Sequence, residues 1–204
     1  MKVIAYRGYS GLYGENTLNS FQKAAACFNF TDISMDIQCD AYGDIVVHKE
    51  LIIDNGWRYI HFEDILKQLQ ITNEKKIILS LKGSNKIVKN LENFFRLHSG
   101  LHFSRFIIIS LDIEHLKSFK IPFVLGFMTY NNIESEQIKN IKKINKRIKY
   151  YFVWWEVINQ HIIDACHKEE LEVIAFTINS HEEFVYIRKY TIDGIMSGFE
   201  LKNL

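Results

Sequence analysis

Short, nearly continuous apolar runs alternate along the chain with stretches whose apolar residues recur every three or four positions. The apolar runs cover residues 3–6, 33–37, 77–81, 106–111, 123–127, 150–155, 173–178 and 192–196. Runs without polar alternation are typical of strands that are buried on both faces, as in parallel sheets. The pattern therefore predicts an α/β protein with eight parallel strands, either closed into a barrel or open and doubly wound.

The intervening stretches have the periodicity of amphipathic helices. The clearest helices are expected over residues 15–28, 62–69, 85–97 and 138–149. In the last of these, four isoleucines form the apolar stripe: Ile138, Ile141, Ile144 and Ile148. Six basic residues share this segment, and we expect them to cover its outer face as a solvated surface. Docking to an anionic membrane or an acidic partner through residues 138–149 is the alternative interpretation.

One segment interrupts the alternation of strand and helix. Residues 37–38 and 45–48, which begin or end with strand-forming residues, flank Ala41-Tyr42-Gly43-Asp44, a sequence typical of a tight turn. This arrangement predicts a β-hairpin directly after the second strand. It would lie on the strand-to-helix side, where barrel enzymes place their active sites.

Composition narrows the class of protein further. The chain has 204 residues, of which 48% are hydrophobic and 24% charged, and its net charge is +1. We expect one domain spanning residues 1–204, and the balanced charge argues against nucleic acid as a general partner. Cys27, Cys39 and Cys166 are too few and too widely spaced for a disulfide framework. No apolar run is long enough for a membrane span, and Arg7 interrupts the first run, so we expect a cytoplasmic protein.

Several short motifs resemble those of the glycerophosphodiester phosphodiesterase family. Residues 4–8 read Ile-Ala-Tyr-Arg-Gly and residues 14–18 read Gly-Glu-Asn-Thr-Leu, where the family has His-Arg-Gly and Pro-Glu-Asn-Thr. Further matches follow in order: Ser-Met-Asp-Ile at 34–37, Leu-Ser-Leu-Lys-Gly at 79–83, Ser-Leu-Asp at 110–112, Phe-Thr-Ile-Asn at 176–179 and Asp-Gly-Ile-Met-Ser at 193–197. The resemblance implies a (β/α)8 TIM barrel with a small β-hairpin insertion after strand 2.

The resemblance also implies a chemistry. Members of this family hydrolyse glycerophosphodiesters with a divalent cation, usually Mg²⁺ or Ca²⁺, held by three carboxylates. Two His residues serve as the general acid and base. Hard cations require several oxygen ligands, and imidazole titrates near neutral pH, so both residue types suit this chemistry.

The sequence departs from the family at most of the positions that carry this chemistry. Tyr6 replaces the first His, and Ser34 and Ser80 replace two of the three carboxylates. Asp36 is the one carboxylate that remains, and it is a weak metal ligand alone. We therefore expect no cofactor, with Mg²⁺ or Ca²⁺ possible only if the family site is retained.

The position of the second catalytic His depends on how the hairpin is aligned. Without a gap, the family's His-Asp falls on Lys49 and Glu50, whereas a slip of one residue brings His48 to the catalytic position. Such a slip would turn the neighbouring side chains to the opposite face of the strand. Arg7, His48 and Lys49 are the candidate catalytic residues, with His48 and Lys49 as alternatives.

The charges that remain favour an anion. Arg7, Lys49 and Lys82 stand against Asp36 and Glu15, and a guanidinium group can bind a phosphate through two N–H groups. We expect Arg7, Glu15 and Lys82 to form a binding site for a small phosphodiester or phosphate. The alternatives are a plain salt bridge between Arg7 and Glu15, and an Asp36 that only accepts hydrogen bonds from Arg7 or Lys82.

Two adjacent tryptophans end the sixth apolar run. Alternation along a strand points one of them into the barrel and the other towards the helices. We assign Trp155 to the substrate-binding residues, with packing in the core as the alternative. Two functions remain open on the sequence: a divergent phosphoric diester hydrolase, and a non-catalytic barrel that binds or regulates through a phosphate pocket.

Overall fold

The computed structural model describes residues 1–52, 59–69 and 75–203. Eight parallel strands form the ring: β1 (Lys2–Ala5), β2 (Asp32–Cys39), β5 (Ile77–Leu81), β6 (Phe106–Ser110), β7 (Val124–Thr129), β8 (Ile148–Trp154), β9 (Glu172–Phe176) and β10 (Gly194–Ser197). Strand β1 pairs with β10 on one side and with β2 on the other, which closes the ring. The predicted TIM barrel is therefore confirmed, and the open doubly wound alternative is excluded.

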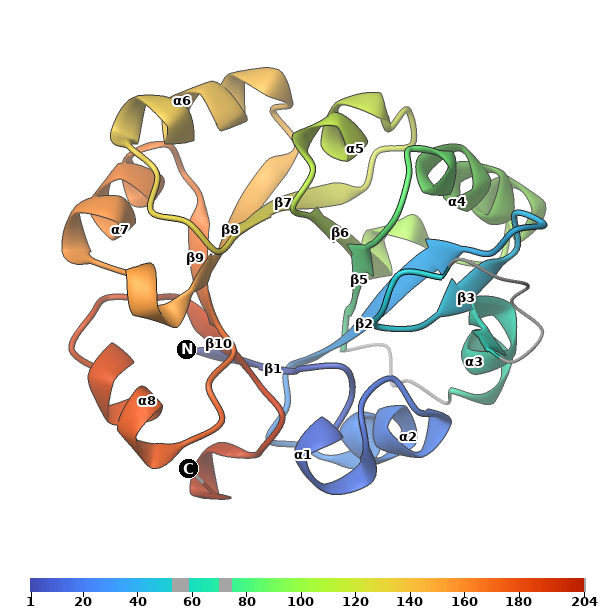
Figure 1. The fold of residues 1–204 in the computed structure, drawn as a ribbon, viewed down its shortest axis with the longest axis horizontal. Coiled ribbons are helices and arrows are strands. Elements are labelled where there is room, and N and C mark those ends of the chain that lie inside the picture. Colours follow the sequence, from blue (N-terminus) through green and yellow to red (C-terminus); the bar gives the residue numbers. More distant parts are fainter. Residues whose placement is uncertain (53–58, 70–74, 204) are drawn as a thin grey trace.

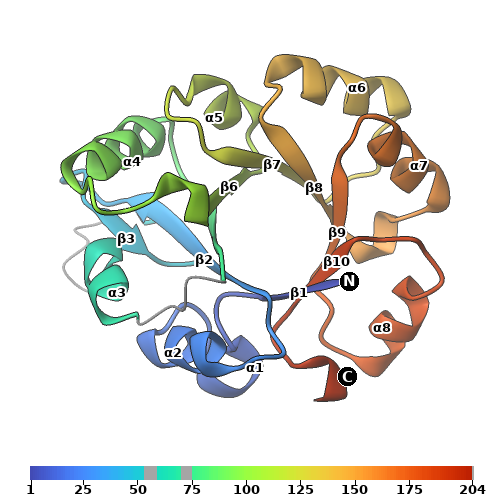
Figure 2. The same cartoon turned by 180° about the vertical axis from the view of Figure 1, so that it is seen from behind.

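Helices form an outer layer around the barrel (Figures 1 and 2). They are α1 (Ser10–Tyr13), α2 (Leu18–Ala26), α3 (Phe62–Gln68), α4 (Lys86–Leu97), α5 (Ile113–Ser118), α6 (Ser135–Ile144), α7 (Gln160–Lys168) and α8 (His181–Ile187), with short 3₁₀ turns at Phe103–Arg105, Trp155–Val157 and Leu201–Asn203. Helix α2 begins after Thr17, whose Oγ1 accepts a hydrogen bond from the Ser20 backbone N–H at 3.0 Å. Thr17 thus satisfies one of the free N–H groups at the helix start.

The strands separate two apolar cores. The inner core fills the barrel with one side chain from every other position: Ile4, Ile78, Ile107, Ile109, Met128, Tyr150, Phe152, Ile174, Phe176 and Met196. In β2, Ile33, Met35 and Ile37 belong instead to the larger core between strands and helices. Because side chains alternate along a strand, Ser34 and Asp36 point to the inside of the barrel. This alternation places polar groups at its carboxyl end.

The predicted hairpin is present and lies outside the ring. Strand β3 (Ile45–Val47) runs antiparallel to β2, with Ile37 opposite Val47, and the two-residue strand β4 (Ile60–His61) adds a third member. The Gln38 side chain holds the loop that follows β3, since its Nε2 donates to the carbonyl oxygens of His48 and Glu50 at 3.2 and 2.5 Å. The hairpin is thereby fixed beside the carboxyl end of the barrel.

The helix predicted over residues 138–149 is too long. Helix α6 ends at Ile144, and Ile148 is the first residue of β8. Asn145 separates the two elements, because its side-chain oxygen accepts from the Arg147 N–H at 3.0 Å and its Nδ2 donates to the Leu116 carbonyl at 2.9 Å. The apparent stripe therefore joined two elements: Ile144 is 37% exposed, and Ile148 is buried as a strand residue.

The basic residues of the same segment are divided in their roles. Lys142 donates to the Ile148 carbonyl at 3.0 Å, and Arg147 donates to the carbonyls of Phe119 and Ile121. These two cations are used within the fold and do not contribute to an outer basic face. Across the described ranges, no helix has the length and apolar character to cross a membrane.

Candidate functional site

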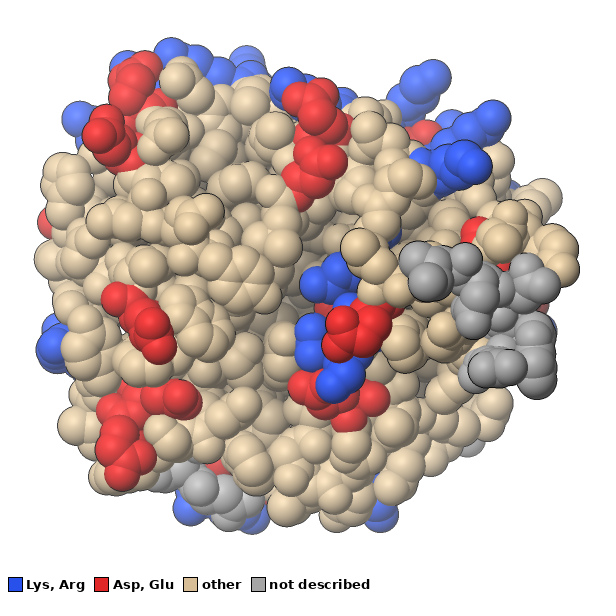
Figure 3. All heavy atoms as spheres, in the orientation of Figure 1, with Lys and Arg blue, Asp and Glu red and all other residues tan. Residues whose placement is uncertain are grey.

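Three cations and two carboxylates meet at the carboxyl ends of β1, β2 and β5. The Arg7 Nε lies 2.6 Å from Asp36 Oδ2, and the Lys82 Nζ lies 3.8 Å from Asp36 Oδ1. The Arg7 Nη1 also lies 3.2 Å from Glu15 Oε1, and Glu15 Oε2 lies 2.8 Å from the Lys49 Nζ. We call these five residues the mouth ion network. Figure 3 shows charged side chains of both signs gathered near the middle of this face, beside a broad uncharged area.

The solvent exposure of the side chains increases across the mouth ion network, from Asp36 to Lys49. The side chain of Asp36 is 4% exposed and that of Arg7 15%, whereas Lys49 is 46% exposed. Asp36 is therefore the inner anchor, and the Glu15–Lys49 pair forms the outer rim. Because the outer pair is solvated, water weakens it far more than it weakens the contact between Arg7 and Asp36.

The backbone around Arg7 is held in an unusual conformation by its neighbours. Arg7 has a φ of 54°, in the left-handed region. Ser34 Oγ accepts from the Arg7 N–H at 3.0 Å and donates to the Ala5 carbonyl at 3.2 Å, while the Arg7 carbonyl accepts from the Asn16 N–H at 3.0 Å. Ser34, which stands where the family that the sequence resembles has a carboxylate, thus fixes the turn that presents Arg7.

Asn16 orients the Asp36 carboxylate. Its Nδ2 donates to Asp36 Oδ2 at 3.2 Å, and its Oδ1 accepts from the Asp36 backbone N–H at 3.1 Å. The cap of the following helix is the neighbouring Thr17 and not Asn16. A buried asparagine beside a buried aspartate gives no signal in the spacing of the sequence, so the contact could be found only from the structure.

Electrostatics keep the network charged. Burial alone would raise the pKa of Glu15, but the hydrogen bond from Lys49 and the charge of Arg7 hold it below its ordinary value. Burial would lower the pKa of Arg7, but the adjacent Asp36 raises it. Burial raises the pKa of Tyr6 to about 12, against the opposing effect of Arg7. Tyr6 therefore stays a neutral phenol, and its ring lies 4.7 Å from the Arg7 guanidinium carbon.

The structure separates His48 from Lys49. His48 directs Nδ1 to the Glu50 carbonyl at 3.1 Å, and its ring packs against Tyr59 with 4.6 Å between centroids. Lys49 reaches back to Glu15 and joins the mouth ion network. Of the two alternatives for the acid or base, Lys49 is the one that the hairpin brings to the other site residues.

The two tryptophans point to opposite sides of the barrel wall, as alternation requires. Trp155 packs in the outer core against Tyr186, with 5.6 Å between ring centroids. Trp154 packs with the inner core, where it contacts Phe176 and Tyr130. The structure therefore does not bring Trp155 to the other site residues, and the tryptophan at the mouth is Trp154. Tyr130 lies beside Trp154, directly after β7, and the residues around it form no motif that would mark it in the sequence.

Solved structures show which fold this geometry belongs to. A phosphodiesterase from Oleispira antarctica, in complex with the product sn-glycerol-3-phosphate, is 15% identical and superposes with a TM-score of 0.78 over 100% of this chain and 95% of the other. A glycerophosphodiester phosphodiesterase from Parabacteroides distasonis is 14% identical, with a TM-score of 0.83 over 99% and 94%. The chain has the glycerophosphodiester phosphodiesterase fold. The enzyme from Thermotoga maritima, 17% identical, gives a TM-score of 0.77 over 96% and 93%.

Sequence comparison gives no relative to set beside these structures. No protein-family model matches the chain, and no curated protein matches it. The similarity to the glycerophosphodiester phosphodiesterase fold is therefore one of backbone architecture. What the mouth binds is therefore inferred from the chemistry of its own residues.

The residues at the mouth do not fit a divalent metal ion. Asp36 Oδ2 already accepts from Asn16 and is ion-paired with Arg7, and Oδ1 faces Lys82. In the part of the chain that the structure describes, no group of three or more His, Cys, Asp or Glu residues could hold a metal ion. A hard cation needs several free oxygen ligands, and here the main carboxylate is surrounded by positive charge. We derive no chemical step through a metal.

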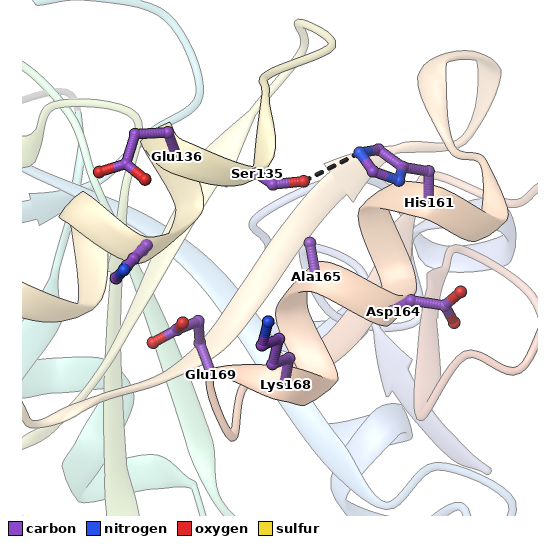
Figure 4. A pocket seen from close by; sticks show the side chains of 8 residues that line it. Ser135, Glu136, His161, Asp164, Ala165, Lys168 and Glu169 are labelled. Carbon is purple, nitrogen blue, oxygen red and sulfur yellow. Dashed lines mark hydrogen bonds between the residues drawn. The ribbon is translucent and has the colours of Figure 1, made fainter.

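A hollow of about 370 Å³ lies outside the barrel between α6 and α7 (Figure 4). Ser135 Oγ lies 2.9 Å from His161 Nε2 there, but Asp164 points away and accepts from Gln160 at 2.7 Å. Lysines and glutamates of both helices line the rest of the groove. None of the predicted site residues lines it, so the barrel mouth remains the candidate site.

Proposed function

We propose that the barrel mouth binds the phosphate group of a small phosphodiester or phosphomonoester directly, through Arg7 and Lys82. The observation that supports this is the mouth ion network, in which three cations face two carboxylates at the carboxyl ends of the strands. Barrel proteins place their ligand sites at this end. The positive excess and the fork of N–H groups on Arg7 suit a phosphate.

The proposal assigns different roles to the two carboxylates. Asp36 is buried and held by Arg7, Asn16 and Lys82, so it stays in place and fixes the directions of the cations. Glu15 is part of the solvated rim and bridges Arg7 to Lys49. An incoming phosphate replaces the Glu15 carboxylate as the partner of Arg7. Binding then exchanges one ion pair for another and needs no rearrangement of the barrel.

The ligand described for a structural neighbour supports the same chemistry. The Oleispira antarctica phosphodiesterase is described in complex with sn-glycerol-3-phosphate. A glycerophosphate combines the phosphate that the mouth suits with a small polar tail. We therefore take sn-glycerol-3-phosphate as the first probe for this chain.

Binding without the family's standard hydrolysis is the function that the residues favour. Tyr6 stands where the related family has its first His, and its pKa of about 12 makes it a poor general base near neutral pH. Hydrolysis is a second candidate because Lys49 lies at the network. The hydrogen bond to Glu15 raises the Lys49 pKa, which keeps the amine protonated and able to act as an acid.

Calorimetric titration with sn-glycerol-3-phosphate tests the proposal. We expect binding by the parent protein and a loss of affinity of roughly 10-fold or more for Arg7→Gln and for Lys82→Met, because hydrogen bonds to charged groups contribute about 1.5–3 kcal/mol. Lys89→Met, which removes an exposed lysine of α4, is the matched control and should bind as the parent does. Equal affinity in all four proteins would refute the proposal. Release of sn-glycerol-3-phosphate from glycerophosphocholine by the parent, lost in Lys49→Met, would instead establish the hydrolase.

A further inference from the structure

The uncharged half of the barrel mouth is made of aromatic side chains. Tyr130 follows β7, Trp154 ends β8 and Phe176 ends β9. The ring centroid of Tyr130 lies 5.2 Å from that of Phe176 and 5.9 Å from that of Trp154. We call these three residues the aromatic wall. It stands on the strands that contribute no residue to the mouth ion network.

Tyr130 is the most exposed member of the aromatic wall, and Trp154 is partly buried. Tyr130 is 46% exposed, whereas Phe176 is fully buried. Its phenol also senses the charged half of the mouth. Burial raises the pKa of Tyr130, the charge of Arg7 opposes this rise, and Asp36 adds to it. The Tyr6 ring contacts both the inner core beside the aromatic wall and the Arg7 guanidinium, so a ligand held by Arg7 lies on the same side of the barrel as Tyr130.

The rings of the aromatic wall pack on Phe176 edge to face. Tyr130 and Phe176 meet at 82°, and Trp154 and Phe176 meet at 65°. Edge-to-face contacts of this kind stabilise the three rings among themselves. A cage for a quaternary ammonium group needs several ring faces turned towards one cavity. Here Phe176 is buried, so Tyr130 is the ring that a ligand reaches most readily, and stacking on a single ring suits a planar group.

We infer that the ligand of the mouth is a phosphate ester of an aromatic group, whose ring stacks on Tyr130 while its phosphate enters the mouth ion network. This inference rests on the proposed function, because the phosphate contacts fix where the rest of the ligand lies. The base of a nucleoside monophosphate and the ring of an aryl phosphate share this chemistry. Stacking of a base on an aromatic side chain typically raises affinity by roughly 5- to 100-fold.

Calorimetry with four small phosphates tests the inference: adenosine 5′-monophosphate, phenyl phosphate, ribose 5-phosphate and phosphocholine. We expect at least one aromatic ester to bind about 10-fold more tightly than ribose 5-phosphate. The tighter of the two aromatic esters identifies the source of the ring. Tyr130→Ala should remove the preference, and Tyr130→Phe should keep it because the ring face remains. Tyr42→Ala, at an exposed tyrosine of the hairpin turn, is the matched control.

Three results would overturn the inference. Ribose 5-phosphate could bind as tightly as both aromatic esters, phosphocholine could bind most tightly, or Tyr130→Ala could leave the preference intact. In each case binding that is lost in Arg7→Gln would leave the proposed function standing. Absence of binding by all four phosphates would refute the proposed function and this inference together.

Discussion

Replacing Asp36 with Asn should lower the stability of the protein and raise its affinity for phosphate. The buried carboxylate of Asp36 lies 2.6 Å from Arg7 Nε, 3.2 Å from Asn16 Nδ2 and 3.8 Å from Lys82 Nζ. Neutralising it leaves two cations facing each other without their inner counter-charge. The same change makes both cations available to an anionic ligand, which would then supply the missing charge.

The size of the stability loss follows from the burial of the pair. Removing one partner of a fully buried ion pair costs about 3–5 kcal/mol. Arg7 keeps 15% of its side chain exposed and keeps its contact with Glu15, so we expect about 2–4 kcal/mol for Asp36→Asn. For a protein of this length the melting temperature should fall by roughly 5–15 °C.

Thermal unfolding with and without inorganic phosphate measures both effects. Phosphate should raise the melting temperature of Asp36→Asn by more than it raises that of the parent, because ligand stabilisation grows with affinity. Asp164→Asn, at an exposed carboxylate of α7, should change neither quantity. An Asp36→Asn protein that melts like the parent and binds phosphate more weakly would refute the reasoning, and would make Asp36 a direct ligand contact.

Three further variants test the cap of α2, the titration of His115 and the two buried serines at the mouth. Thr17→Ala should cost about 1 kcal/mol in chemical denaturation, because the Ser20 N–H loses its cap; no change would contradict the assigned helix start. Burial lowers the pKa of His115, so the unfolded state binds the proton more readily and the stability of the protein should fall below about pH 6.5. His115→Asn should flatten the dependence of stability on pH in this range. An unchanged dependence would exclude His115 as its source. The double variant Ser34→Glu with Ser80→Glu should lower the melting temperature, since both serines are buried. Added calcium should restore part of the loss. An unchanged melting temperature would show that the mouth is open at these positions.

Most of the barrel could be predicted because its strands are buried on both faces. Every predicted apolar run overlaps a strand of the ring, and 77–81 matches β5 at both ends. The helix over 138–149 failed because Ile148 happens to continue the spacing of α6 across the break at Asn145. Periodicity alone cannot show where one element ends and the next begins when both bury isoleucine on the same side.

The gathering of the charged residues could also be foreseen, because the carboxyl ends of neighbouring parallel strands meet. What could not be foreseen depends on single-residue geometry. The turn after β3 decides that Lys49, and not His48, reaches Glu15. The phase of β8 decides that Trp154 faces the barrel interior and Trp155 the helices. A shift of one residue reverses either outcome, and the sequence pattern does not resolve a shift of that size.

The central claim is that the protein's own cations bind phosphate at the barrel mouth without the help of a divalent ion. Titration with sn-glycerol-3-phosphate in a chelating buffer, repeated with magnesium and with calcium, tests it most directly. Arg7 and Lys82 carry the interaction in this account, so the dissociation constant should be the same in all three buffers. Binding that appears only with a divalent ion would contradict the account and would mean that Asp36 holds a metal there.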